Sequence, residues 1–272
     1  MLAFAANSIL CRMALGGHLI DAASFTTIRL VSGAIILMVI LVLRDLSLKT
    51  QIIDIKASAA LFLYAICFSF AYINLSTGTG ALILFGTVQL TMVVFGVLQG
   101  DRPKLFAWVG IVLACSGLVY LVSPGVSAPS LTGTLLMVTA GLAWGVYSLR
   151  GKGVTNPVAA TTWNFIGTVP LTVISSLFFI ASSDIKSSGV LLAILSGALA
   201  SGVGYVIWYA ALPYLKPSSA AAVQLSVPMI AAIGGVVFMA EPLTLRITIA
   251  SVTILGGIAL VINTNRTRLH QK

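Results

Sequence analysis

The residues that could do chemistry in this sequence are polar side chains within long apolar stretches. Gln89 and Gln224 each fall in an early-to-middle turn of an expected helix. A glutamine amide donates and accepts hydrogen bonds without ionising, which suits a zwitterionic solute. The same amide also bonds one helix to another inside a membrane bundle. Both interpretations stay open for the two glutamines, and also for Asn7, Asn74 and Asn164.

Two arginines, Arg12 and Arg29, also lie inside apolar stretches. Because arginine binds carboxylates bidentately, Arg29 is a candidate contact for the carboxylate of a substrate. The alternative is a side chain that snorkels to the lipid head groups or caps a neighbouring helix end. Arg29 is only about a third of the way along its expected helix, so we favour this alternative for it. Arg12 is near the end of its own helix, and we expect it to snorkel.

Aromatic side chains form a second group of candidates. Tyr205, Trp208 and Tyr209 share one face of an expected helix, because they are three and four residues apart. Trp144 and Tyr147 share a face in the same way. These rings line either a binding cavity or the aromatic belt at the membrane surface. Nearby glycines would let a solute or a neighbouring helix approach: Gly141, Gly145 and Gly204.

Ionisable residues that could act in catalysis are absent from the middle of the apolar stretches. The acids and histidines all fall in expected loops or at helix ends: Asp21, Asp45, Asp54, Asp101, Asp184, Glu241, His18 and His270. We therefore expect no proton relay through a buried acid. An enzyme site, which needs a nucleophile, a general base or a metal cluster, is not expected either. The cysteines Cys11, Cys67 and Cys115 lack metal-ligand spacing, so no metal and no cofactor are predicted.

Hydropathy decides which elements must position these residues. Of the 272 residues 59% are hydrophobic and only 8% are charged, with a mean hydropathy of +1.10. Soluble domains carry about 25% charged residues, so lipid must be the solvent of this chain. Ten stretches have the length of about 20 apolar residues that a membrane-spanning helix needs. They cover roughly residues 1–17, 23–43, 57–75, 80–99, 104–122, 131–149, 158–180, 190–212, 218–239 and 243–263.

The distribution of positive charge predicts how these helices are oriented. The formal net charge is +9, yet its placement argues against nucleic-acid binding. With a cytoplasmic N-terminus, the outer loops hold only Lys186 and Arg246. The inner loops and tail then hold eleven basic residues: Arg44, Lys49, Lys56, Arg102, Lys104, Arg150, Lys152, Lys216, Arg266, Arg268 and Lys272. This asymmetry follows the positive-inside rule, so both termini are predicted to be cytoplasmic.

The two halves of the chain repeat one another. Residues 87–103 align with residues 226–242 at an offset of 139 residues (242 − 103), and the register continues to Gly117 and Gly256. Each half holds five expected helices, and an odd number inserts the second half upside down relative to the first. The uncharged, turn-rich segment 123–130 is the expected linker. We therefore predict an all-α integral membrane protein with ten transmembrane helices in two inverted five-helix repeats, residues 1–124 and 131–265.

The dipeptide Glu241-Pro242 precedes the last expected helix. Proline at the first helical position with an acid before it is typical of a helix start, where the positive end of the helix dipole favours the acid. We expect this structural role for Glu241, and the same role for Asp101 in the first half.

These motifs resemble those of the EamA domain. The resemblance rests on Glu241-Pro242, the small-residue run 218–222, the pair Gly256-Gly257, and Gly100-Asp101-Arg102 where such domains usually have Gly-Glu-Arg. Ala240 departs from the usual glycine before the glutamate, and Asp101 departs from glutamate. Two EamA domains in tandem make up the drug/metabolite transporter superfamily, and the resemblance covers essentially the whole chain.

The resemblance implies a central cavity between the repeats, lined mainly by the first, third, fourth, sixth, eighth and ninth helices. The fifth and tenth helices would lie outside it. The residues that would then bound the cavity and bind substrate are Asn7, Tyr72, Gln89, Trp144, Tyr147, Tyr205, Trp208 and Gln224.

The function that the resemblance implies is export of a small metabolite across the bacterial inner membrane by alternating access. A neutral cavity with aromatic walls favours an amino acid over a strong cation. The alternative is a drug or nucleotide-sugar carrier of the same superfamily, although a nucleotide sugar would need a phosphate-binding pocket and only Arg12 and Arg29 lie within spans. A membrane-embedded enzyme is a remote alternative. The expected partners are a small-molecule substrate and the lipid bilayer, and a homo-oligomer stays open.

Overall fold

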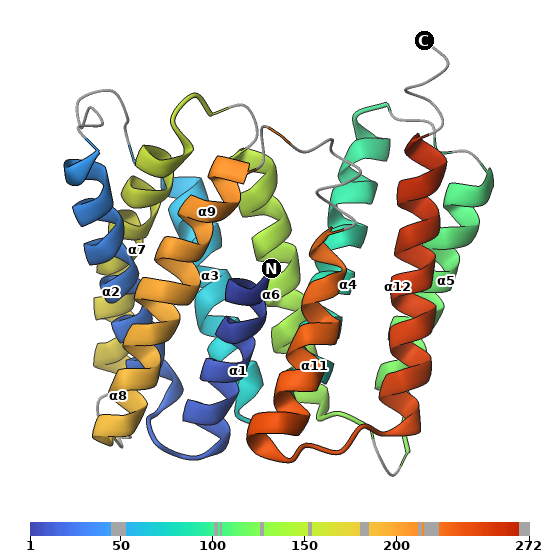
Figure 1. The fold of residues 1–272 in the computed structure, drawn as a ribbon, viewed down its shortest axis with the longest axis horizontal. Coiled ribbons are helices and arrows are strands. Elements are labelled where there is room, and N and C mark those ends of the chain that lie inside the picture. The colour runs from blue at the N-terminus through green and yellow to red at the C-terminus, as the bar shows by residue number, and fades with distance from the viewer. Residues whose placement is uncertain are drawn as a thin grey trace.

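A computed structural model describes residues 1–44, 53–100, 103, 105–125, 128–151, 154–179, 185–211, 214 and 223–266. Its helices stand side by side along one long axis (Figure 1). They are α1 (Leu2–Gly16), α2 (Ala22–Leu43), α3 (Ile55–Tyr72), α4 (Thr77–Leu98), α5 (Leu105–Val122), α6 (Leu131–Arg150), α7 (Pro157–Phe179), α8 (Ser187–Ile194), the π-helical segment η3 (Leu195–Val203), α9 (Gly204–Ala211), α11 (Ser226–Met239) and α12 (Leu245–Arg266).

The predicted class, an all-α integral membrane protein, is confirmed. Within the described ranges, eight helical spans are long and apolar enough to cross a membrane, and α1 and α11 are two shorter apolar helices. The seventh of these spans, Ser187–Trp208, runs without a break through α8 and η3 into α9. The helix expected over 218–239 begins as α11 at Ser226, while residues 215–222 and the motif residues Asp101 and Arg102 lie outside the described residues.

The bundle has two ends, named here after the arginines that mark them. At the Arg150 end, which is at the top of Figure 1, α6 finishes and α3 begins. Asp54 caps α3 by accepting from the backbone N–H of Ala57 at 3.1 Å, and it pairs with Arg150 at 2.7 Å. Partial burial raises the pKa of Asp54, but the hydrogen bonds from Arg150 and the backbone outweigh it and hold the pKa below its ordinary value.

At the opposite end, the Arg12 end, the expected helix start at Glu241-Pro242 is wrong. The last helix, α12, begins at Leu245, and Glu241 serves a different helix. Its carboxylate accepts from the backbone N–H of Thr77, the first residue of α4, at 2.8 Å. Ala240 has φ +52°, a left-handed conformation that ends α11 and turns the chain toward α4. Glu241 therefore lies at a helix N-terminus, where the helix dipole favours a negative charge, but the helix is α4 and not α12.

Arg12 completes this end of the bundle. Its Nε pairs with Glu241 Oε1 at 3.1 Å, and its Nη1 donates to the carbonyls of Tyr72 and Ile73 at 3.0 and 2.9 Å. Arg12 thus caps the C-terminal end of α3 and pairs with Glu241, whereas the sequence led us to expect that it snorkels to the head groups. The contacts join α1, α3, α4 and the end of α11.

Helix packing pairs elements from the two halves of the chain. Helix α2 packs on α7, α4 packs on α11, and α5 packs on α12. The pair α5 and α12 forms one edge of the bundle (Figure 1). Helix α3 packs on α6, while α1 packs on α8 and η3. The helices expected to bound a cavity therefore lie in the middle of the bundle, and α5 and α12 lie away from it.

Backbone contact between α5 and α12 leads to a first prediction. A Cβ atom at Gly257 would lie 2.6 Å from the carbonyl oxygen of Gly110 and 2.7 Å from the backbone nitrogen of Ala114. Gly257→Ala should therefore destabilise the protein by about 1–3 kcal/mol, because helix backbones must move apart. Gly256→Ala is the matched control, since a Cβ at Gly256 meets nothing within 4 Å. Thermal unfolding in detergent checks this, and equal melting temperatures for the two variants would contradict it.

Candidate functional site

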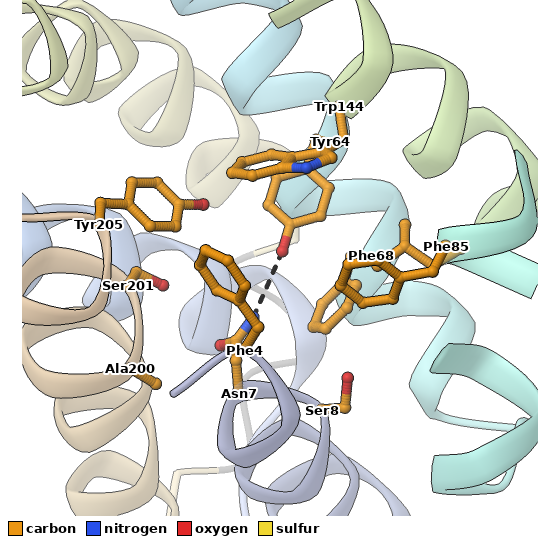
Figure 2. Close-up of a pocket in the computed structure, with 11 residues that line it drawn as sticks. Phe4, Asn7, Ser8, Tyr64, Phe68, Phe85, Trp144, Ala200, Ser201 and Tyr205 are labelled. Carbon is orange, nitrogen blue, oxygen red and sulfur yellow. Dashed lines mark hydrogen bonds between the residues drawn. The ribbon is translucent and has the colours of Figure 1, made fainter. Parts of the chain in front are cut away.

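A small cavity lies in the middle of the bundle, where helices of both halves meet. The volume open to the centre of a water molecule is about 20 Å³, which is room for about one water. Eleven residues line it (Figure 2): Phe4, Asn7, Ser8, Tyr64, Phe68, Leu84, Phe85, Trp144, Ala200, Ser201 and Tyr205. Three of the eight predicted site residues, Asn7, Trp144 and Tyr205, are therefore at this cavity.

A hydrogen-bonded chain of neutral groups crosses the cavity wall. The Asn7 amide of α1 donates to the Tyr64 hydroxyl of α3 at 3.3 Å, as drawn in Figure 2. The Asn7 carbonyl oxygen accepts from the Ser196 hydroxyl of η3 at 2.6 Å. These groups both donate and accept, so they can exchange their mutual bonds for bonds to a polar solute.

Aromatic rings make up much of the remaining wall. The ring of Trp144 lies 4.8 Å from that of Tyr64 and 5.2 Å from that of Tyr205, measured between centroids. Phe4 meets Tyr205 edge to face at 5.8 Å and Trp208 at 6.2 Å. Trp208 therefore contacts a wall residue without lining the cavity itself. Such rings offer apolar faces to the body of a solute.

Two other predicted residues, Tyr72 and Tyr147, lie behind the wall. Tyr147 is buried, and its ring centroid is 5.4 Å from that of Trp144. Tyr72 packs against Phe68 at 4.8 Å, and its hydroxyl donates to the carbonyl of Thr77 at 3.3 Å. Both support residues of the wall, and neither lines the cavity in this conformation.

The two predicted glutamines meet each other away from the cavity. The Gln89 amide nitrogen donates to the Gln224 amide oxygen at 3.4 Å, joining α4 to the segment before α11. This distance is longer than the usual range of about 2.7–3.2 Å for an N–H donor, so the bond is weak. The pair is thus a contact between the two halves, and a role in substrate binding stays a prediction.

Arg29 lies next to the cavity, and the snorkelling interpretation of it is wrong. Only 1% of the residue is exposed. Its Nη2 donates to the Tyr64 hydroxyl at 3.0 Å, and its Nε approaches the Ser201 hydroxyl at 3.4 Å. The guanidinium also lies 5.2 Å and 5.0 Å from the ring centroids of Tyr64 and Phe68. The side chain is held inside the bundle because α3 and η3 enclose it.

Several wall residues were not expected from the sequence, and Tyr64 is the most connected of them. It bonds both Asn7 and Arg29, and its ring packs on Trp144. The signal was present, because Tyr64, Phe68 and Tyr72 follow one another at four-residue steps and share one face of α3.

The π-helical segment η3 was also not expected, since residues 190–212 were predicted as one regular helix. It supplies Ser196, Ala200 and Ser201 to the site. π-helical turns are rare and occur frequently at functional sites, because the wider turn changes which side chains face a neighbour. Here it directs Ser196 toward Asn7 and Ser201 toward Arg29.

The glycines near the aromatic residues bring helices together. A Cβ at Gly141 or Gly145 would lie 2.7 Å from a side-chain carbon of Thr87 or Thr91, respectively, on α4. A Cβ at Gly204 would lie 2.8 Å from that of Ala3 on α1. Of the two interpretations of these glycines, close approach of a neighbouring helix is therefore the one that the contacts support.

The site suits binding by hydrogen bonds and apolar contact. In the part of the chain that the structure describes, no group of three or more histidine, cysteine or acidic residues comes together. The polar groups of the wall are an amide, hydroxyls and, just behind them, the Arg29 guanidinium. Such a wall can hold a small solute that has one polar end and one apolar end.

A family model described as the EamA-like transporter family matches residues 131–263. An uncharacterized protein of Pseudomonas aeruginosa is 48% identical over 262 residues, which are 96% of this chain and 91% of that protein. An uncharacterized transporter of Bacillus subtilis is 22% identical over 90% of this chain and 89% of its own length. An uncharacterized inner membrane transporter of Escherichia coli is 29% identical over 49% of this chain and 41% of its own length.

A solved crystal structure resembles the whole bundle. The TM-score is 0.68 at 18% sequence identity, and the match covers 100% of this chain and 98% of that chain. At this identity the likeness bears on the fold alone, and it agrees with the helical membrane bundle described above.

Proposed function

Because the chain belongs to the EamA-like transporter family, we propose that it is a secondary transporter that exports amino acids across the bacterial inner membrane by alternating access. The chain is a multi-pass membrane protein of a transporter family, and the proposal adds the solute, the direction and the mechanism. The observation that carries it is the central cavity, whose wall combines neutral hydrogen-bonding groups with aromatic rings from both halves.

The packing supports the proposal that residues 1–124 and 131–265 are inverted repeats. Three helices of the first half pack on the helix with the same order in the second half: α2 on α7, α4 on α11, and α5 on α12. Contact between counterparts is what a two-fold axis in the membrane plane produces. A cavity on such an axis can open to either side when one half rocks against the other.

The chemistry of the wall supports an amino acid as the solute. The amide of Asn7 and the hydroxyls of Tyr64 and Ser201 can bond both charged ends of a zwitterion without adding net charge. Trp144 and Phe4 offer apolar faces for a side chain. The cavity has room for about one water, so the helices must move apart to admit a solute.

The charges support a cytoplasmic location of both termini. Of the described basic residues at helix ends, Arg44, Lys56 and Arg150 lie at the Arg150 end of the bundle, where the C-terminal helix α12 also finishes. Lys186 and Arg246 lie at the opposite end. The positive-inside rule assigns the richer end to the cytoplasm.

Counterflow uptake in proteoliposomes, with a panel of radiolabelled amino acids, tests this function. We expect exchange of one class of amino acid by the wild type. Gln89→Ala and Gln224→Ala should lose most of this exchange if the glutamines contact the solute between the two halves. Exchange that survives both substitutions would assign the glutamines to helix packing. No exchange of any amino acid by folded protein would refute the proposed substrate.

A further inference from the structure

Arg29 is a buried cation without a carboxylate partner among the described residues. Its bonds go to two neutral hydroxyls, and its Nη1 is buried with no hydrogen-bond partner at all. The ring faces of Tyr64 and Phe68 add weak attraction, but they carry no net charge. The guanidinium therefore keeps a full positive charge and an unused donor next to the cavity.

A charge in this position is costly for the protein. Arginine cannot lose its proton in a protein, so burial cannot neutralise it. A buried charge that lacks a partner is strongly destabilising, and charged residues inside a membrane bundle usually belong to a functional site. Packing alone does not require a cation here, because the surrounding groups are hydroxyls and aromatic rings.

None of the three described acids is paired with Arg29, although Asp21 Oδ2 is buried without a hydrogen-bond partner. Asp54 pairs with Arg150, and Glu241 pairs with Arg12. Asp21 caps the start of α2, where it accepts from the backbone N–H of Ser24 at 2.9 Å. It precedes Arg29 by two helical turns, about 12 Å along the axis. A negative charge for Arg29 must therefore come from outside this set.

We propose that Arg29 binds the carboxylate of the transported solute, an amino acid with a single carboxylate and an apolar side chain. This inference rests on the proposed function and specifies its substrate class. Tyr64, Phe68 and Ser201 contact Arg29 on one side and line the cavity on the other. A carboxylate in an opened cavity takes the place of these hydroxyls and reaches Nη1, while Trp144 and Phe4 contact the apolar part.

Ligand-induced stabilisation of the purified wild type tests this without any substitution. The probes are leucine, phenylalanine and alanine, each compared with its amide, together with 4-methylpentanoate, which is leucine without its amino group. We expect at least one of the amino acids and 4-methylpentanoate to raise the melting temperature, and the matching amides to have no effect. An amide that stabilises as well as its acid would overturn the proposal. The proposal would also be overturned if no carboxylate changed the melting temperature. Counterflow exchange of some other solute would in that case still support the transport function.

Variants of Arg29 give a second, independent readout. Arg29→Gln should weaken carboxylate binding by about tenfold or more, and Arg29→Lys should weaken it less, because the charge remains but the fork of donors is lost. Arg44→Gln is the matched control, since Arg44 is exposed at the end of the same helix.

The melting temperature without ligand separates a binding role from a packing role. A cation kept for binding can be replaced without loss, so Arg29→Gln should melt at the same or a higher temperature while the shift with carboxylates disappears. A variant that melts lower and still responds to carboxylates like the wild type would overturn the proposal. If Arg29→Gln does not fold, carboxylate binding by Arg29→Lys and the comparison of acids with amides on the wild type still test whether Arg29 binds the carboxylate.

Discussion

Replacing Gly197 by alanine is expected to leave little folded protein and to abolish exchange in proteoliposomes. Gly197 lies in η3, directly against α2. A Cβ at this position would overlap the carbonyl oxygen of Arg29 and the hydroxyl of Ser32. The Arg29 carbonyl belongs to the backbone of α2, so the clash cannot be relieved by turning a side chain. We expect a loss of stability of about 3 kcal/mol.

The functional consequence of Gly197→Ala follows from its neighbours. Ser196 bonds Asn7, and Ser201 bonds Arg29, so any outward shift of η3 moves both groups relative to the cavity. Displacements of about 1 Å at a binding site are enough to reduce activity strongly. Exchange should therefore be lost even in the fraction of protein that folds.

Melting temperature and monodispersity in detergent measure the first effect, and counterflow measures the second. Gly256→Ala makes the same chemical change where a Cβ meets nothing within 4 Å. It should fold and exchange like the wild type. Normal stability of Gly197→Ala would show that η3 and α2 are not packed as closely as the structure places them.

Loss of the Glu241 charge is expected to have the second largest effect on the stability of the protein. Glu241→Gln should destabilise the protein by about 2 kcal/mol, because it leaves the Arg12 guanidinium without its only described counter-ion. The Arg12 and Glu241 side chains are 24% and 14% exposed, so water compensates only part of the loss. The contact also joins α1 and α3 to the end of α11, and weakening it should loosen the Arg12 end of the bundle.

Asp54→Asn provides the matched comparison for Glu241→Gln. It makes the equivalent change in the ion pair at the other end, where the Arg150 and Asp54 side chains are 40% and 38% exposed. Exposed ion pairs contribute about 1 kcal/mol or less, so this variant should melt close to the wild type. Equal losses for the two variants, measured as melting temperatures at neutral pH, would argue against the difference in burial as the cause.

The expected positions of the spans follow from local properties of the chain. Ten apolar stretches each reach the length of a membrane helix, and each of them corresponds to a helix or part of one in the described residues. In lipid every backbone group must be satisfied within the segment, so a long apolar stretch has helix as its only option. The repeat and the family resemblance likewise needed only the order of residues.

Prediction of the site was less complete, because its residues come together from distant parts of the chain. Asn7 bonds Ser196 across 189 positions, and Arg29 bonds Ser201 across 172. Local sequence indicates that a residue lies in a helix, but not which face of that helix meets which neighbour. Arg29 was therefore assigned to the head groups, and Tyr64 was overlooked although its helical face was visible in the spacing.

Glu241 shows most directly what could be predicted from the sequence and what depended on the tertiary structure. The sequence by itself predicted that the acid before Pro242 would be at the N-terminus of the last helix, because a helix dipole favours a negative charge there. Only the tertiary structure decided that the helix is α4 instead, that Arg12 shares the carboxylate, and that Arg29 has no such partner. The physical reason is that helix formation depends on neighbours along the chain, whereas charge pairing and cavity shape depend on the packing of separate helices.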